Sequence, residues 1–342
     1  MKKNGKSVAA VIATFTVFVL LVCITYPVLE MKDSEDRYST FYRCEKNFDI
    51  LFLGTSHVMN GISPMRLWHE YGYTSCSLAG PGCRIPVGYW LLREALTRTD
   101  PSLVVIDCAT LESIKVLQDT SYNHVAFDHM PLSKVKLQAI FDLYHDRVNQ
   151  IVEFLFPFCI YHNRWSSLKT EDLRSHKNAM FGYDAMFIRK DQNWSAPLIA
   201  DEAPELDNYG TEYLERIVDL CRENGVNILL TYIPYNSESE SAAEAAWVRD
   251  YALREKIPFL GPDDLVEAID IHTDFAYDAH LNYWGAKKMT DYFGAYFNQH
   301  YQLVDSRKTP DLDYWQSFYN EYVQEIMTIA REAGYPDLDV DA

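Results

Sequence analysis

The hydrophobic pattern of the chain changes from one long apolar segment near the amino terminus to an alternation of short apolar runs and amphipathic segments. The alternation begins near residue 48. The short runs have the length and the β-branched content of buried strands. They predict five strands, at Phe48–Leu53, Tyr73–Leu78, Leu103–Cys108, Val226–Ile233 and Ile257–Leu260.

Between the predicted strands, apolar residues recur at helical spacing. Ser63-Pro64 supplies an N-cap followed by proline at the first helical position, and Asn224-Gly225 is typical of a helix end. Strands that alternate with amphipathic helices favour an α/β fold with a parallel sheet covered on both faces. The predicted helices are Pro64–Tyr71, Val87–Thr97, Tyr213–Glu223, Ala242–Glu255 and Tyr283–Phe297.

Two regions depart from this alternation. Residues 112–206 contain a helix-like segment, Lys134–Tyr144, and an apolar run, Phe154–Ile160, among polar stretches. We interpret this region as a helical or irregular insertion over the sheet edge, which shapes a substrate groove. The insertion interrupts a domain that we expect to span residues 48–300. Residues 301–342 are expected to form a helical appendage.

The amino-terminal apolar segment has the properties of a membrane anchor. Val8–Leu29 is an uncharged run of 22 residues, and a helix needs about 20 apolar residues to cross a bilayer. Three lysines precede it and acidic residues follow, so the positive-inside rule places residues 1–7 in the cytoplasm. Residues 30–47 are expected to form a polar linker, and the domain to lie outside the cell. A cleaved signal peptide is the alternative, but no Ala-x-Ala site closes the run.

Composition narrows the choice of partners. The formal net charge is −18, so nucleic acid and anionic lipid surfaces are poor partners for the chain. Aromatic residues make up 14% of the chain, which suits a groove that stacks on sugar rings. The cysteines lack the spacing of zinc or redox motifs, so no metal or cofactor is expected. Only Cys76 and Cys83 are close enough in the sequence to suggest a local disulfide.

The first predicted strand ends in a sequence that fits a catalytic nucleophile. Gly54-Thr-Ser56-His57 follows the strand directly, and a tight turn there would expose the Ser56 hydroxyl beside its own N–H group. Ligands bind at this carboxyl edge in open α/β sheets. The alternative is an ordinary turn capped by a serine. The sequence is not the Gly-x-Ser-x-Gly elbow, because Val58 occupies the last position.

A histidine near the end of the domain is the best candidate for the base. His280 follows Asp278 by two residues and precedes a helix start. Asp278 could orient the imidazole by accepting its Nδ1 proton, which would leave Nε2 free for Ser56. We rank His57 as groove lining because neighbouring side chains usually diverge, and we also consider His129 and Asn282 as groove candidates. The other rival histidines are His124 and His162.

Three sequence blocks together resemble the SGNH (GDSL-like) hydrolase superfamily. They are Gly54-Thr-Ser-His57, Leu78-Ala-Gly80-Pro81, and the Asp-x-His-Leu-Asn sequence at Asp278. The resemblance covers residues 48–298 and is strongest to a membrane-anchored branch related to the alginate O-acetylation and teichoic-acid D-alanylation proteins. It implies a flavodoxin-like three-layer α/β/α sandwich.

The resemblance also implies roles for individual residues. Ser56 would be the nucleophile, His280 the base and Asp278 the orienting acid, and the N–H groups of Ser56 and Gly80 would form the oxyanion hole. Many family members place the acid three residues before the histidine. Asp278 stands two before it, so Asp274 is kept in reserve. The family's Gly-x-Asn-Asp block, which gives a third oxyanion donor, is missing, and Thr110 is the candidate substitute.

These features predict an extracytoplasmic enzyme that transfers or removes a small acyl group, most simply acetyl, on a cell-envelope glycan. By family analogy, a membrane-bound O-acyltransferase would be the partner that supplies acyl groups. One alternative is a surface esterase that only hydrolyses esters of carbohydrate or lipid. The other is a glycan-binding scaffold of weak or no activity, which the missing asparagine block favours.

Overall fold

The structure is a computed structural model, and it describes residues 2–30, 37–109, 111, 120–169, 179–191, 199–235, 239–277 and 280–341. The chain forms two compact units. One comprises Met1–Ser34 with Ile140–His176, and the other comprises Glu35–Ala139 with Lys177–Ala342. The second unit contains the sheet and the residues expected to carry the chemistry.

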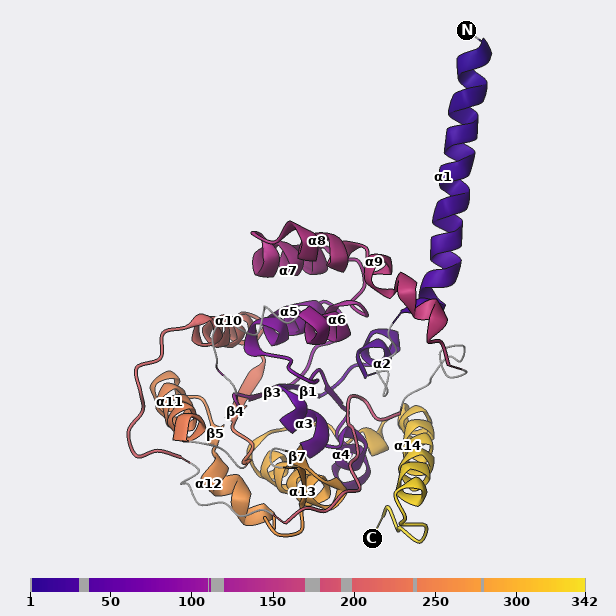
Figure 1. Ribbon diagram of the computed structural model, residues 1–342. Coiled ribbons are helices and arrows are strands. Elements are labelled where there is room, and N and C mark those ends of the chain that lie inside the picture. Colours follow the sequence, from indigo (N-terminus) through magenta and orange to yellow (C-terminus); the bar gives the residue numbers. More distant parts are fainter. Residues whose placement is uncertain are drawn as a thin grey trace. The chain divides into compact units, whose positions relative to one another are not determined.

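A parallel five-stranded sheet forms the centre of the larger unit (Figure 1). Its strand order is β2-β1-β3-β4-β5, and every neighbouring pair is parallel. The prediction of a mixed α/β fold with a parallel sheet is therefore confirmed. The strands are β1 (Ile50–Leu53), β2 (Ser75–Ser77), β3 (Leu103–Asp107), β4 (Asn227–Thr231) and β5 (Phe259–Leu260).

Helices cover both faces of this sheet. In Figure 1, α5 (Ile85–Ala95) and α10 (Tyr209–Glu223) lie on one face, while α4 (Pro64–Tyr71) and α13 (Tyr283–His300) lie on the other. Since both faces are covered, every residue of β1 and β3 is buried. That is why these strands read as continuous apolar runs rather than as an alternating pattern.

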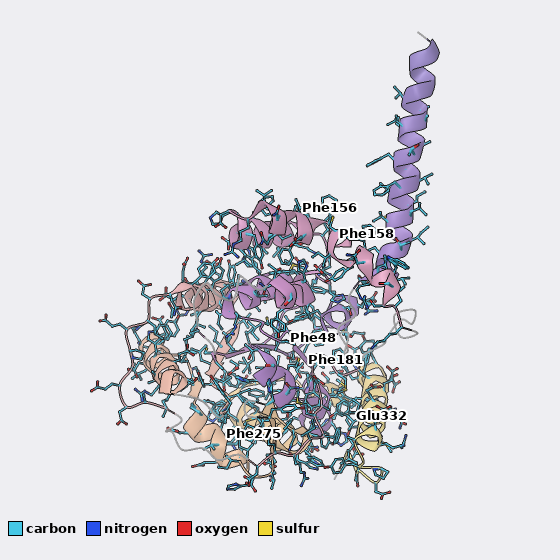
Figure 2. The ribbon with its side chains drawn as sticks, in the orientation of Figure 1. Phe48, Phe156, Phe158, Phe181, Phe275 and Glu332 are labelled. Carbon is cyan, nitrogen blue, oxygen red and sulfur yellow. The ribbon has the colours of Figure 1, made fainter. Side chains whose placement is uncertain are left out.

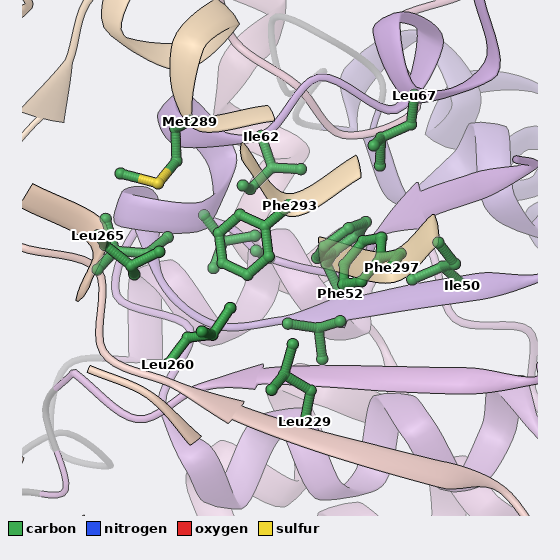
Figure 3. Close-up of a cluster of buried hydrophobic side chains, with 14 of the residues drawn as sticks. Ile50, Phe52, Ile62, Leu67, Leu229, Leu260, Leu265, Met289, Phe293 and Phe297 are labelled. Carbon is green, nitrogen blue, oxygen red and sulfur yellow. The ribbon is translucent and has the colours of Figure 1, made fainter. Parts of the chain in front are cut away.

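The hydrophobic core on the α13 side joins side chains from the sheet and from several helices (Figure 3). Phe52 of β1 packs against Phe297 of α13, with ring centroids 6.2 Å apart. Phe293 lies beside Phe297 and is fully buried. Each large side chain buried in this way contributes roughly 1.5–3 kcal/mol. This packing fixes α13 and the residues that lead into it.

The predicted helix boundaries are confirmed where the sequence carries explicit capping signals. Ser63 caps α4 by accepting a hydrogen bond from the Arg66 N–H, and Gly72 ends the helix in a left-handed conformation. Asn208 caps α10, which ends at Glu223 as predicted. The remaining elements of this unit include α11 (Ser239–Glu255), α12 (Pro262–Leu265), η4 (Val266–Ala268) and η5 (Ser306–Lys308).

The chain begins with one helix, α1 (Lys2–Leu29), whose segment Val8–Leu29 is long and apolar enough to cross a membrane. The expected linker of residues 30–47 is only partly correct. Arg37–Arg43 forms the short helix α2, in which Tyr38 and Phe41 are buried. Phe41 stacks on Phe48 at 5.6 Å. Apolar side chains spaced three residues apart in a mostly polar stretch therefore attach this segment to the domain.

The predicted insertion between β3 and α10 contains helices in its described residues. They are α6 (Thr120–Phe127), α7 (Lys134–Tyr144), α8 (Val148–Leu155), α9 (Phe158–Tyr161) and η2 (His162–Ser166). Residues 140–176 group with α1 in the smaller unit rather than with the sheet. Their packing includes a stack of Tyr144 on Phe154, with ring centroids 4.7 Å apart.

The carboxyl-terminal helix α14 (Leu312–Glu332) belongs to the larger unit. Trp315 is buried against Phe48 and Phe181, with centroid distances of 5.8 and 5.6 Å. Figure 2 shows Phe48 and Phe181 near each other. Residues far apart in the sequence thus close one aromatic cluster, which the local pattern of residues 301–342 does not reveal.

The suggested disulfide between Cys76 and Cys83 is wrong. Both are buried free thiols. Cys76 lies on β2 and directs its sulfur toward the carbonyl of Phe181, at 3.7 Å. Proximity in the sequence therefore did not bring the two sulfurs together, because the strand holds the Cys76 side chain among its own neighbours.

Candidate active site

Ser56 stands at the point where β1 gives way to a short helix, α3 (Ser56–Gly61). Thr55 caps this helix, and its hydroxyl accepts a hydrogen bond from the His57 N–H at 3.4 Å. The first N–H groups of a helix have no partner within the helix. Within the described part of the chain, the Ser56 N–H donates to no other group either. It is therefore available beside the Ser56 hydroxyl.

Close packing at Gly54 fixes this turn. A Cβ atom at Gly54 would lie 2.6 Å from Cγ2 of Val58 and 2.9 Å from Cβ of Asp107. Real Cβ atoms do not approach other atoms so closely, so only glycine allows the turn to pass between α3 and the end of β3. The turn at Gly54 also places Ser56 at the carboxyl edge of the parallel sheet, where ligands bind in open α/β folds.

His280 reaches the Ser56 hydroxyl. Its Nε2 lies 2.8 Å from Oγ of Ser56, although 224 residues separate the two in the sequence. His280 begins β7 (His280–Leu281), which pairs with β6 (Phe275–Tyr277) in an antiparallel hairpin. The hairpin contacts α3. The structure thus brings together two of the residues that the sequence singles out for nucleophile and base.

Asn282 holds the histidine segment in place and does not line a groove. It is fully buried, and its Oδ1 caps α13 by accepting hydrogen bonds from the N–H groups of Trp284 and Gly285, both at 3.1 Å. Its Nδ2 donates to the carbonyls of Thr273 and Phe275. The expectation of a groove role is corrected, because all of its polar capacity is used in fixing the start of α13.

Burial keeps His280 in the form that a base requires. It lowers the pKa of His280 below its ordinary value, since partial removal from water disfavours the charged imidazolium. The neutral ring can accept the Ser56 proton on Nε2 when its own proton is on Nδ1. Among the described residues, Nδ1 of His280 has no hydrogen-bond partner. Asp278, the expected orienting acid, lies outside the described residues.

The reserve acid, Asp274, is committed elsewhere. It is buried, and its Oδ2 lies 2.6 Å from Nζ of Lys288 and 2.7 Å from the N–H of Asp270. Its Oδ1 accepts a hydrogen bond from the Thr273 hydroxyl. Within the described chain it makes no contact with His280. Asp274 therefore fixes the loop before β6, and the reserve assignment is corrected.

His57 is buried beside His280 and does not line an open groove. Only 7% of it is exposed, and its ring packs on Tyr235 at 4.4 Å and lies 5.8 Å from the ring of His280. Burial, together with the charges of His280 and Arg84, lowers the pKa of His57 to about 3. The ring is therefore neutral at physiological pH. The prediction of groove lining is corrected because so little of the ring meets solvent.

Asp107, at the end of β3, is the most unusual carboxylate near the site. It is 1% exposed, and its Oδ1 accepts a hydrogen bond from the Ile233 N–H at 2.9 Å. Its Oδ2 faces Nδ1 of His57 at 3.9 Å, and neither atom has a hydrogen-bond partner among the residues that the structure describes. Burial raises the pKa of Asp107 to about 7, against the hydrogen bonds from Ile233 and Ala109 that lower it.

This raised pKa predicts a pH-dependent penalty on stability. The folded-state pKa lies above the ordinary value for aspartic acid. The folded state therefore binds the proton more tightly than the unfolded state, and stability falls as pH rises toward and through about 7. Asp107→Asn should keep the bond from Ile233 and remove this loss. We expect the variant to gain at least about 1 kcal/mol relative to wild type between pH 5 and pH 8, since one pKa unit corresponds to about 1.4 kcal/mol.

Thermal unfolding of the full chain in detergent at the two pH values measures this difference. Asp201→Asn is the matched control, because Asp201 is an exposed aspartate. If the stability of both variants depends on pH in the same way as that of wild type, the pKa of Asp107 is not raised in the folded state.

Gly80 follows β2, the strand next to β1. A Cβ atom there would lie 2.7 Å from the Tyr38 hydroxyl, so a larger residue would require the Tyr38 side chain to shift. Within the described chain the Gly80 N–H donates no hydrogen bond, which leaves it available. Thr110, the third expected oxyanion donor, lies outside the described residues. His129 is half-buried after α6, and the described chain shows no contact between it and Ser56 or His280.

Sequence reasoning gave no role to three residues around this centre, namely Asp107, Arg84 and Tyr235. Arg84 precedes α5, and its Nε and Nη1 atoms are buried without hydrogen-bond partners in the described part of the chain. Tyr235 follows β4 and donates a hydrogen bond to the Ser241 hydroxyl. A charged residue that ends an apolar strand was a usable signal for Asp107. Arg84 and Tyr235 carry no comparable signal.

Comparisons with known proteins do not identify the chain. No family model and no curated protein matches it. Among solved structures, it is similar to a crystal structure from Bacteroides fragilis of a protein named as an inferred acylhydrolase. The two share 12% sequence identity with a TM-score of 0.40, over 79% of this chain and 98% of the other. At these values the similarity supports no assignment, so the function is inferred from the site itself.

Proposed function

We propose that the chain is a serine-dependent acyl-ester enzyme of the SGNH type, built on a flavodoxin-like three-layer sandwich. One observation carries the proposal, namely the 2.8 Å contact between Nε2 of His280 and Oγ of Ser56 at the carboxyl edge of the sheet. A serine is a weak nucleophile unless a neighbouring base removes its proton as it attacks. The strand order and the sequence resemblance support the same reading.

The proposed reaction has two steps. In the first, Oγ of Ser56 attacks the carbonyl carbon of an ester while Nε2 of His280 takes the hydroxyl proton. The C–O bond of the ester then breaks, the leaving alcohol takes that proton, and an acyl-serine remains. In the second step, Nε2 of His280 takes a proton from water or from a sugar hydroxyl as its oxygen attacks the acyl carbon. The bond between that carbon and Oγ of Ser56 then breaks, and His280 returns the proton to Oγ, which restores both side chains.

The developing negative charge on the carbonyl oxygen needs hydrogen-bond donors. We assign the N–H groups of Ser56 and Gly80 to this oxyanion hole, with Thr110 as the third candidate. One such donor is worth about 3 kcal/mol in other enzymes, so a hole with two donors would give slow turnover. Asp278 is the proposed orienting acid for His280, since the structure commits Asp274 to Lys288.

The substrate proposal rests on the membrane anchor and on the family resemblance. An enzyme held at the outer membrane face by α1 would meet cell-envelope glycans, and acetyl is the simplest acyl group to propose. A membrane-bound O-acyltransferase partner would favour transfer over hydrolysis. A surface esterase differs only in that water, rather than a sugar hydroxyl, resolves the acyl-serine. A glycan-binding scaffold has no specific structural observation in its favour.

Labelling with a fluorophosphonate probe tests the proposal. The probe phosphonylates a serine only where a base activates it, and we expect one modified residue in the full chain, Ser56, identified by peptide mass spectrometry. Ser75 is a suitable internal comparison, because it is a buried serine whose hydroxyl has no hydrogen-bond partner in the chain as described. An absence of label on Ser56 in folded protein would favour the scaffold.

A further inference from the structure

Helix α8 in the smaller unit exposes apolar side chains along one side. Val148 is 70% exposed, Val152 is 44% exposed and Phe156, directly after the helix, is 64% exposed. These three residues are four apart in sequence, so they follow one face of the helix. We call them the α8 stripe. A soluble surface rarely leaves such a row of large apolar side chains in water.

The opposite side of α8 is already packed within the same unit. Phe154 is 1% exposed and stacks on Tyr144. The helix therefore has two apolar faces. One is buried against the protein, and the other is exposed. The second face needs a different occupant, because the protein core has already taken the first.

A direct contact joins this segment to the end of the apolar helix α1. Nη1 of Arg164, in η2, donates hydrogen bonds to the carbonyls of Leu29, at 2.8 Å, and Glu30. The last carbonyls of a helix have no partner within the helix, so an arginine there both satisfies and neutralises the helix end. Val8–Leu29 is the candidate membrane span, and Leu29 therefore marks its boundary.

The residue next to Arg164 has the character of a membrane-interface side chain. Trp165 is 72% exposed, and tryptophan is enriched where the hydrocarbon core meets the headgroups. In Figures 1 and 2, α8 lies across the direction of α1, and Phe156 lies on the side of α8 toward which α1 extends. Phe156 and the membrane span thus lie on the same side of this unit.

From these observations we infer that the α8 stripe rests in the interface of the bilayer that α1 crosses, with lipid headgroups and the first acyl carbons as its occupant. The attraction is hydrophobic rather than electrostatic, since the chain carries a net charge of −18 and the neighbours of the stripe include both Asp146 and Arg147. Interfacial helices bind by inserting an apolar face to a depth of about 5–10 Å. The protein would then hold the membrane by two contacts, the span and the stripe.

Site-directed spin labelling of the full chain in nanodiscs of neutral phosphatidylcholine tests this inference. A nitroxide is attached at Val152→Cys in a background in which the less buried thiols, Cys23, Cys44 and Cys159, are replaced by serine. Leu253→Cys on α11 is the control, because Leu253 is 79% exposed and belongs to the larger unit. Circular dichroism of both labelled proteins must match that of wild type.

Collision rates with oxygen, which concentrates in lipid, and with a water-soluble nickel chelate give the outcome. We expect the label at Val152 to be open to oxygen and about 10-fold less accessible to nickel than the label at Leu253, as for side chains in the interface. Equal access to nickel at both positions would overturn the inference and leave a protein partner as the natural occupant. Exclusion of both reagents at Val152, or recovery of the chain outside the nanodiscs, would overturn it as well.

Discussion

Ser56→Ala and His280→Ala are each expected to abolish turnover of a small chromogenic acetyl ester by the full chain in detergent. Nε2 of His280 lies 2.8 Å from Oγ of Ser56, so removing either atom removes the activated nucleophile. In well-studied serine hydrolases, losing one member of such a unit lowers kcat by about 10⁶-fold. We expect a loss of at least about 10⁴-fold here, because an oxyanion hole with two assigned donors limits the starting rate.

The double variant distinguishes a catalytic unit from two independent contributions. If the two side chains act together, Ser56→Ala with His280→Ala should be no slower than the slower single variant. Independent effects would instead multiply. Ser75→Ala and His300→Ala are matched controls. The Ser75 hydroxyl has no hydrogen-bond partner within the described residues, and His300 is an exposed residue at the far end of α13.

Two results would contradict the acyl-serine mechanism. One is near wild-type activity in Ser56→Ala, and the other is an equal loss in the control variants, which would indicate unfolding. The pH profile adds an independent check. Burial lowers the pKa of His280, so the neutral base should persist below pH 6.5. Activity that already declines above pH 6.5 as the pH is lowered would point to a different base.

The sequence predicted the parts of this molecule in which local pattern and tertiary packing agree. Strands β1 and β3 are buried on both faces, so their apolar runs were visible without a structure. The boundaries of α4 were equally visible, because Ser63 and Gly72 are local capping signals. Ser56 could be predicted as the candidate nucleophile because it directly follows a buried strand.

The missed features depend on contacts between distant residues. Helix α3 has only six residues and no apolar repeat, so no local pattern indicated that Ser56 would begin a helix. Asp107 accepts a hydrogen bond from the N–H of Ile233, which is 126 residues away in the sequence, and it lies beside His57. Both neighbours come from distant parts of the sequence, so its burial could not be predicted. Tyr38 and Phe41 read as part of a polar linker, because their partners lie elsewhere in the chain.

The same reasoning explains the misplaced assignments. Asn282 and Asp274 are polar residues close to a candidate catalytic histidine, which made both attractive as site residues. The structure instead shows both at 0–1% exposure, with hydrogen bonds that hold the loop around β6 and the start of α13. Buried polar groups need such partners. A polar residue that is close in sequence to a candidate catalytic residue can therefore serve to hold the local backbone instead of taking part in the reaction.

The orientation of the candidate span Val8–Leu29 would decide which substrates the proposed enzyme can meet, and its expected effect is all-or-none. Three lysines precede Val8 and acidic residues follow Leu29, so the amino terminus should remain in the cytoplasm with the larger unit outside. Protease added to intact, wall-stripped cells should digest that unit completely. It should spare a short fragment that carries an amino-terminal tag and α1.

Two controls make the protease result decisive for the proposed substrate. A cytoplasmic protein probed in the same samples must stay intact, and permeabilised cells must lose both that protein and the tag. Survival of the larger unit until permeabilisation would place Ser56 and His280 in the cytoplasm, where envelope glycans are absent and soluble esters are the available substrates. That outcome would leave the serine chemistry testable by the variants above while removing the glycan from the proposal. Digestion in intact cells would place the Ser56–His280 pair on the same side of the membrane as the envelope polymers.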